Sequence, residues 1–164
     1  MEERTRLERR VAGLVKLRRR GTSSPDPFRE ALLGAVTQAP GASWEALARV
    51  LACPVEPVRE TLAQWGVRDR EVREGLPRRA KRGATLLEAL LGAESPGREG
   101  FDELRGEVSD SRSPLCLALW ILRGLPEASG EPLREVRLLG QGLDEREARS
   151  FLKVLLEILG EERG

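Results

Sequence analysis

The chain has 164 residues, of which 40% are apolar, and this is enough to bury a hydrophobic core. Its 28 basic and 27 acidic side chains leave a net charge of +1, which excludes a disordered polyelectrolyte and gives no support for a polyanion bound along the whole chain. The sequence contains no His, so His-containing zinc sites, His-based nucleophilic catalysis and His-ligated haem are excluded.

The charges are distributed unevenly along the chain. Residues 1–85 carry 18 basic and 11 acidic side chains, whereas residues 86–164 carry 10 basic and 16 acidic ones. Arg is far more common than Lys, and charged residues make up 34% of the chain, a composition that fits a thermophile. No apolar run is long enough to span a membrane, and the N-terminus lacks the apolar segment of a signal peptide. We therefore expect a cytoplasmic protein that does not enter a membrane.

Residues 1–21 are predicted to form one basic amphipathic helix. Leu7, Val11 and Leu14 share one helical face, and the segment ends in three arginines and Gly21. Basic residues stabilise the C-terminus of a helix and glycine stops it, which explains this ending without a ligand. Two other interpretations stay open, in which the arginines contact phosphates or the helix docks on a partner.

A unit of three short helices is predicted over residues 27–66, after a linker that contains two prolines. The first helix runs from Pro27 to about residue 39. The second follows Ser43 as its cap, and we expect its buried face to consist of Trp44, Leu47, Val50 and Leu51. The third runs from about Val55 to Trp65 and is ended by Gly66, with Val55, Val58, Leu62 and Trp65 on its inner face.

The segment SWEALARVLACPVEPVRETLAQW resembles the helix-turn-helix, or winged-helix-like, superfamily of DNA-binding proteins. In that family a small residue packs between two crossing helices and a branched apolar residue anchors the second one. Ala48 and Val58 stand at those positions. The turn position that is usually Gly is Ala52, which requires either a right-handed turn or some strain.

The resemblance implies that the outward face of the third helix contacts DNA. That face centres on Glu56, Glu60 and Ala63, with Arg59 and Gln64 beside it. Two carboxylates pointing into a groove lined by phosphates are repelled, so simple reading of the major groove is disfavoured. Nucleic-acid binding through phosphate contacts by the basic segments is the better expectation.

Residues 67–113 are predicted to form a basic connector followed by an acidic loop. We expect a loop or a helical extension over 67–83, a short helix over 84–91, and a weak helix near 101–108. The candidate nucleic-acid contacts of the whole chain are the basic and amide side chains Arg18, Arg19, Arg20, Arg59, Gln64, Arg68, Arg70, Arg78, Arg79, Lys81 and Arg82.

A second helical unit is predicted over residues 114–164. It consists of an apolar helix over 115–125, a helix containing Leu133, Val136 and Leu139, and a final helix capped by Asp144. The final helix is apolar on more than one face, so other helices, a partner or a second copy must cover Phe151, Leu152, Leu155, Leu156 and Leu159. The apolar positions of this second unit, from Leu117 to Phe151, match those of residues 28–62 at an offset of 89. A tandem of two three-helix units is therefore one interpretation.

No catalytic, metal-binding or cofactor-binding constellation is found. Cys53 and Cys116 lie far apart without a C-x-x-C motif, and an acidic cluster at residues 102–110 has the spacing of a solvated helix face. The sequence therefore predicts an all-α protein that is not an enzyme. Its expected function is that of a DNA-associated regulator, and the alternative is a helical adaptor in a larger, nucleic-acid-processing assembly.

Overall fold

The computed structural model describes residues 2–21, 26–92, 97–110, 115–125 and 131–163. Within these ranges the chain is helical and contains no strand, which confirms the predicted all-α fold. The helices are α1 (Glu2–Gly21), α2 (Pro27–Gln38), α3 (Trp44–Leu51), α4 (Val55–Trp65), α5 (Arg70–Leu91), α6 (Gly97–Ser109), α7 (Leu115–Arg123), α8 (Glu131–Gly140) and α9 (Glu145–Arg163). Most of the predicted linker, which spans residues 22–27, and most of the segment 126–132 between the predicted helices of the second unit lie outside the described residues. None of the described helices is long and apolar enough to cross a membrane.

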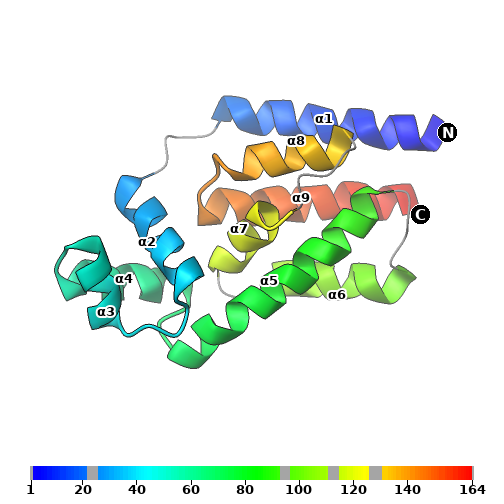
Figure 1. Ribbon diagram of the computed structural model, residues 1–164. Coiled ribbons are helices and arrows are strands. Elements are labelled where there is room, and N and C mark those ends of the chain that lie inside the picture. The colour runs from blue at the N-terminus through cyan, green and yellow to red at the C-terminus, as the bar shows by residue number, and fades with distance from the viewer. Residues whose placement is uncertain (1, 22–25, 93–96, 111–114, 126–130, 164) are drawn as a thin grey trace.

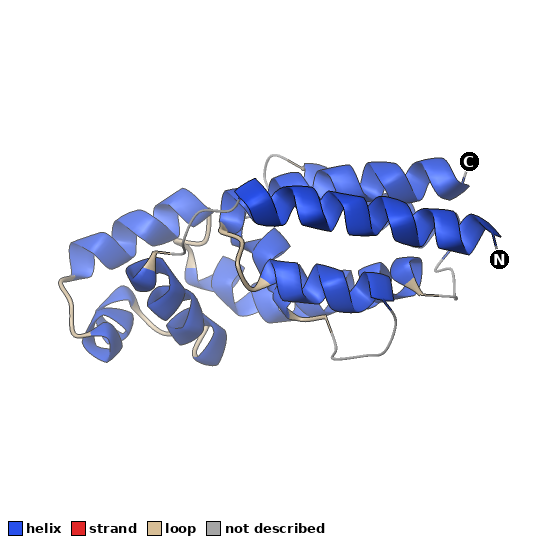
Figure 2. Cartoon of the chain, turned by 90° about the horizontal axis from the view of Figure 1, so that it is seen from above, coloured by secondary structure: helices blue, strands red, loops and turns tan. Residues whose placement is uncertain are grey.

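The helices form an elongated molecule with two different ends. Helices α1, α8 and α9 run alongside one another at one end, where both termini lie, and α2, α3 and α4 form the other end (Figure 1). The long helix α5 runs from the α3–α4 end toward the end that carries the termini (Figure 1). The view from above shows the same elongated shape, built of helices (Figure 2). Helix α5 therefore connects the two ends of the fold.

Helix α7 is the centre of the core, as the apolar sequence of residues 115–125 predicts. Every side chain from Cys116 to Leu122 is buried, and α7 packs on α5, α8 and α9. Two glycines allow these close approaches: a Cβ at Gly83 would lie 2.6 Å from Ile121 Cδ1, and one at Gly140 would lie 2.8 Å from Leu122 Cβ. Because α7 is buried on all sides, its sequence is apolar up to Arg123, the charged residue at its C-terminal end.

Helix α9 begins with the predicted cap. Asp144 accepts a hydrogen bond of 2.8 Å from the Glu147 backbone N–H, and Glu147 Oε1 accepts one from Asp144 N, which makes a reciprocal capping box.

The apolar faces of α9 are covered within the chain. Helices α1, α6 and α7 pack around α9. The predicted partner interface must be corrected here, because its side chains Phe151, Leu152, Leu155, Leu156 and Leu159 are all buried in the core.

The three helices predicted over residues 27–66 form with the expected caps. Ser43 Oγ accepts a hydrogen bond from Ala46 N, and Gly66 ends α4 in the left-handed conformation. Val50 was expected in the buried face of α3, but it is 74% exposed, because it lies on the side of this short helix that no other element covers. The resemblance to the helix-turn-helix family stays a prediction.

The turn between α3 and α4 is strained at Ala52. Its φ and ψ angles of 51° and 47° place it in the left-handed region, and it is the one non-glycine residue with positive φ in the described part of the chain. The conformation lets Cys53 N donate to Ala48 O and Ala52 N donate to Arg49 O, which satisfies the last carbonyls of α3. Of the two geometries that the sequence allowed, the chain adopts the strained one.

Residues 70–91 form one continuous helix, which corrects the predicted division into a connector and a short helix. The inner face of α5 contains Arg73 and several small residues between its leucines: Arg73, Leu76, Ala80, Gly83, Ala84, Leu87, Leu90 and Leu91 are all buried. A charged residue and three small ones hid the apolar periodicity in the sequence. Pro77 lies within the helix on its exposed side.

The two predicted three-helix units pack differently. In the first unit the middle helix α3 contacts both α2 and α4, whereas in the second unit the first helix α7 contacts both α8 and α9. The matching apolar registers therefore correspond to different helix arrangements, and a tandem origin stays a prediction.

Arg73 links the three-helix unit to α5. Its side chain is 2% exposed, and its guanidinium donates to Pro40 O at 3.2 Å and to Ala42 O at 2.6 Å in the α2–α3 loop. It also donates to Val67 O at 3.1 Å and to Arg68 O at 2.5 Å in the α4–α5 loop. Burial lowers the pKa of Arg73 from its ordinary value, but an arginine remains protonated, and here four carbonyls replace water around the charge.

Replacing Ala52 by Gly should stabilise the fold. Gly adopts the left-handed conformation without a Cβ penalty, so Ala52→Gly is expected to raise the free energy of unfolding by about 1 kcal/mol. Urea denaturation measures this change. The control is Ala31→Gly at an exposed position inside α2, which should lower the free energy of unfolding by about 0.5–1 kcal/mol. A loss of stability in both variants would contradict the assigned turn.

Removing the Arg73 guanidinium should be strongly destabilising. Arg73→Met keeps much of the side-chain volume but leaves buried carbonyls without donors, so we expect a loss of about 3 kcal/mol in the free energy of unfolding. Arg70→Met is the matched control, because Arg70 is exposed and pairs only with Glu74 one turn away. That control should change stability by no more than about 0.5 kcal/mol, and equal losses in the two variants would refute the role of Arg73.

Candidate functional site

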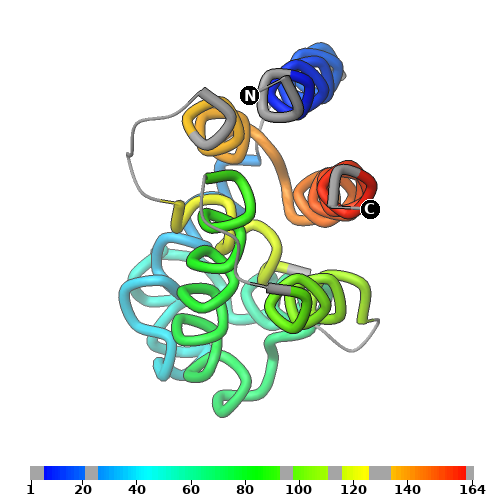
Figure 3. The backbone as a smooth tube through the Cα atoms, turned by 90° about the vertical axis from the view of Figure 1, so that its right-hand side faces the viewer, coloured from blue at the N-terminus to red at the C-terminus, as the bar shows by residue number. Residues whose placement is uncertain are grey.

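The structure separates the eleven predicted nucleic-acid contacts into different groups. The arginines at the end of α1 lie beside α8 and α9: Arg18 donates to Ser150 Oγ at 3.1 Å, and Arg19 lies 3.5 Å from a Glu135 carboxylate oxygen. Arg20 is exposed. Helix α1 packs on α8 and α9, and α8 lies between α1 and α5 (Figure 3). The arginines of α1 therefore do not form one surface with the basic residues of α5.

A second group lies around Trp44. Arg59 and Arg68 place their guanidinium groups 5.9 Å and 5.1 Å from the centre of the Trp44 ring, and Arg59 also pairs with Glu56 at 3.0 Å. The indole Nε1 of Trp44 donates to Arg68 O at 3.4 Å. These two arginines, one on α4 and one in the loop between α4 and α5, thus pack on a half-buried tryptophan.

The outward face of α4 is acidic, as the sequence predicts. Glu56, Glu60, Ala63 and Gln64 are exposed on it. Gln64 Oε1 accepts a hydrogen bond of 3.0 Å from Arg29, so this predicted base-reading side chain is engaged with α2. Two carboxylates and an engaged amide leave this face poorly suited to a phosphate-lined groove.

The basic residues of α5 are partly neutralised by α6. Arg82 forms two hydrogen bonds with Glu103, at 2.5 Å and 2.7 Å, and this contact holds the pKa of Glu103 below its ordinary value. Arg79 pairs with Glu107 in the same way one turn earlier. Residues 102–110 were expected to form a solvated acidic face, but two of their carboxylates bind the arginines that were expected to bind phosphate.

Further ion pairs join the basic part of the chain to the acidic part. Besides the α5–α6 pairs and Arg19–Glu135, they include Arg10 with Glu161 and Arg29 with Glu145, and Arg123 with Glu30 in the reverse direction. Acidic side chains of the second half of the chain therefore pair with many of the basic side chains of the first half.

Among the predicted residues of α5, Arg78 and Lys81 are exposed and have no ion pair with the described part of the chain, whereas Arg70 pairs with Glu74.

An apolar groove of about 580 Å³ lies between α2 and α5, with α7 at its base. Helix α2 contributes Leu33 and Gly34, α5 contributes Pro77 and Ala80, and Trp120 of α7 lies at the base. Its polar rim consists of Glu30, Thr37, Gln38, Lys81 and Arg123. None of these residues was predicted as a binding site except Lys81, because the three helices are far apart in the sequence and only the fold brings them together.

Two buried hydrogen-bond donors of this groove have no acceptor among the described residues. They are Trp120 Nε1 and Arg123 Nε. Trp120 is 7% exposed, and the other nitrogens of Arg123 bind the Glu30 carboxylate at 2.9 Å and 2.7 Å. A buried donor without an acceptor is costly, so each of these two covered nitrogens gains from a side-chain shift that brings an acceptor to it.

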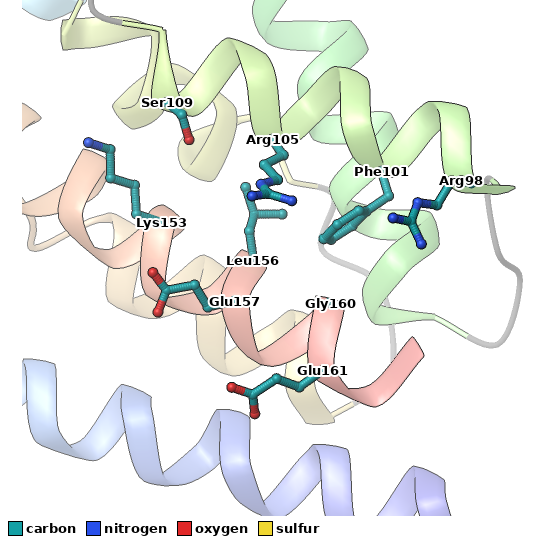
Figure 4. Close-up of a pocket in the computed structure, with 9 residues that line it drawn as sticks. All are labelled: Arg98, Phe101, Arg105, Ser109, Lys153, Leu156, Glu157, Gly160 and Glu161. Carbon is teal, nitrogen blue, oxygen red and sulfur yellow. The ribbon is translucent and has the colours of Figure 1, made fainter. Parts of the chain in front are cut away.

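Two other grooves are more polar. The groove between α6 and α9, of about 760 Å³, is lined by Arg98, Arg105, Lys153, Glu157 and Glu161 around Phe101 and Leu156 (Figure 4). Its cationic and anionic side chains are mixed and exposed. A smaller groove near the N-terminus of α9 contains the Arg29–Glu145 pair, which already occupies its charged groups. Neither groove presents a set of groups suited to one ligand.

The described residues contain no metal-binding cluster. No group of three potential metal ligands occurs among them. Burial raises the pKa of the Cys116 thiol to about 12, so this thiol stays neutral and unreactive, and Cys53 is half-buried. The groove between α2 and α5 is therefore the candidate functional site.

Comparison with known proteins assigns no family. No protein-family model matches this sequence, and no curated protein or solved structure is significantly similar to it.

Removing the acidic partners of Arg79 and Arg82 should create nucleic-acid affinity. The double variant Glu103→Gln with Glu107→Gln removes the carboxylate partners of two guanidinium groups, so its log affinity for random duplex DNA should fall more steeply with log salt, by about 2 in slope, than that of the unmodified protein. Fluorescence anisotropy with labelled DNA measures this slope.

The matched control removes the same net charge without releasing an arginine. Glu99→Gln with Glu157→Gln removes two exposed carboxylates, on α6 and α9, that have no ion pair with the described part of the chain. Its salt dependence should stay close to that of the unmodified protein. Equal DNA affinity in the two double variants would show that the α5–α6 pairs do not mask the arginines.

Proposed function

We propose that this chain is a non-enzymatic helical adaptor, which binds a partner protein in the groove between α2 and α5. One observation carries the proposal: an exposed apolar groove is lined by two residues whose buried donors lack acceptors, whereas most of the basic residues expected to bind nucleic acid are engaged within the chain. Apolar walls with a few polar groups are typical of a surface that takes side chains of another protein.

The distribution of charge does not by itself support an adaptor role, because most of it is paired within the chain. Ion pairs between helices hold the basic and acidic parts together, so they do not leave two oppositely charged surfaces for head-to-tail association. Specificity then depends on the groove. The cytoplasmic location and the thermophilic origin stay predictions from composition.

A DNA-associated regulator is the second candidate function. It is supported by Arg78 and Lys81, which are exposed three residues apart on the same face of α5, and by the exposed Arg20 on α1. Salt-sensitive binding of random duplex DNA or single-stranded RNA by the unmodified protein, weakened by Arg78→Ala with Lys81→Ala, would favour this candidate. The adaptor proposal expects no such binding at moderate salt.

A peptide selection tests the adaptor function. A displayed library of helix-forming peptides of about 16 residues, with a fixed leucine face and randomised flanking positions, is selected on the immobilised protein. The blocking variant is Gly34→Leu, because a Cβ at Gly34 meets nothing within 4 Å and the new side chain fills the groove. The matched control is Gly13→Leu, at an equally open and exposed position on α1.

The adaptor proposal predicts that selected peptides depend on the groove. They should bind the unmodified protein and Gly13→Leu alike, and should bind Gly34→Leu at least about tenfold more weakly. Both substitutions replace a helical glycine by a better helix former, so neither is expected to unfold the protein. If the peptides ignore Gly34→Leu, or if none is enriched, the adaptor proposal is wrong.

A further inference from the structure

We infer that the groove between α2 and α5 takes a two-turn segment of an amphipathic helix from a partner protein, with an acidic side chain next to its apolar anchors. This inference rests on the adaptor function proposed above and adds the chemistry of the partner. It follows from the length of the groove, its small wall residues, its unsatisfied donors and its charge.

The length of the groove matches about two turns of helix. The residues that α2 contributes, from Glu30 to Gln38, recur at spacings of three and four and form one stripe along the helix. Eight residues of rise correspond to about 12 Å. A partner helix lying along this stripe presents two or three apolar side chains to the groove.

Small residues on the walls allow a close approach. Gly34 on α2 and Ala80 on α5 line the groove, and the space at Gly34 is open. A helix backbone approaches another most closely where side chains are short, so its apolar side chains can reach Leu33 and Trp120. A bulky side chain at Gly34 removes this space.

The unsatisfied donors require an oxygen from the partner. Trp120 Nε1 and Arg123 Nε both belong to residues that line the groove, and neither has an acceptor in the described structure. Both nitrogens are covered in the free chain, so a partner oxygen reaches them only when these side chains shift on binding. A carboxylate offers several lone pairs and accepts charge-assisted hydrogen bonds, which are stronger than neutral ones. An acidic side chain beside the apolar anchors therefore complements these two donors.

The charge of the rim favours the same partner. Glu30 is held by Arg123 through two hydrogen bonds, and the other rim residues of α2, Thr37 and Gln38, are neutral. Lys81 is exposed on the α5 side, with Arg78 one turn before it. The unpaired charge along the groove is positive, so an acidic helix is attracted and a basic one is repelled.

A second copy of the chain fits the groove less well than a partner. The apolar faces of α6, α7 and α9 are buried within the molecule. The large exposed apolar side chains of the described residues, Leu17, Val50 and Leu138, lie on three different helices, so they form no amphipathic face. A partner helix with its own free apolar face is therefore the expected occupant.

The test uses peptides from the selection described above. For each groove-dependent peptide, a variant with Glu or Asp replaced by the corresponding amide is synthesised, and both are titrated into the ¹⁵N-labelled full-length protein. The indole N–H signals of Trp44, Trp65 and Trp120 are assigned with single Trp→Phe variants and followed by NMR. Lys81→Gln is compared with Lys16→Gln, which removes an equally exposed lysine from α1.

The inference predicts an acidic residue in the selected peptides. The amide variant should bind about tenfold more weakly, the Trp120 indole signal should move downfield while the Trp44 and Trp65 signals stay, and Lys81→Gln should weaken binding whereas Lys16→Gln should not. Groove-dependent peptides without an acidic preference would overturn this inference and leave the adaptor function intact. No groove-dependent peptide at all would overturn both.

A measurement of molecular mass tests whether a second copy of the chain occupies the groove. Light scattering of the unmodified protein and of Gly34→Leu shows whether the groove binds a second copy. We expect a monomer in both cases. A dimer that Gly34→Leu dissociates would make a second copy the occupant and would overturn the assignment of a separate partner.

Discussion

The burial of one guanidinium group determines how the two ends of this molecule are joined. Arg73 has no carboxylate partner in the core, so its charge is tolerated only because backbone carbonyls surround it. These carbonyls come from the loop before α3 and from the loop after α4, and the guanidinium comes from the second turn of α5. Both loops must therefore keep one position relative to α5. The hydrogen bonds of Arg73 therefore help to hold the three-helix unit against α5, in addition to the packing of its apolar face.

The position of α5 in turn determines the candidate site. With its first turns fixed by Arg73, the helix presents Pro77, Ala80 and Lys81 opposite α2, and α7 closes the base of the groove below Gly83. The opposite side of α5 turns Arg79 and Arg82 toward α6. One helix thus forms a wall of an apolar groove and neutralises an acidic neighbour. Because Arg79 and Arg82 on this helix bind carboxylates of α6, they are not available for the phosphate contacts that the basic composition of the segment indicates.

Local signals in the sequence were sufficient for most of the helices. The caps at Ser43 and Asp144, the stop at Gly66 and the apolar run from Cys116 to Leu122 all correspond to structure. Signals failed where burial depended on distant elements. Arg73 and Gly83 interrupted the apolar pattern of α5 because their partners, two loops and Ile121, are far away along the chain.

The candidate site could not be predicted from spacing. Glu30, Pro77 and Trp120 lie on three helices and are each more than forty residues from the next along the chain, and nothing in the sequence indicates that they meet. The apolar faces of α9 illustrate the same limit, since the sequence shows that they need cover but not which helices supply it. The spacing of the charged residues carries more information about the ion pairs between α5 and α6. Arg79 and Arg82 are three residues apart and Glu103 and Glu107 are four apart, so each pair lies on one side of its helix, and two facing helices bring such pairs together.

The most direct measurement of this account is the hydrogen exchange of arginine side chains by NMR. If Arg73 is buried among carbonyls that fix both loops, its Nε–H signal persists at mildly alkaline pH after the signals of exposed arginines such as Arg20 and Arg78 have exchanged. Exchange of the Arg73 Nε–H as fast as that of these exposed arginines would contradict the account, because the loops and α5 would then lack the contact that holds them together.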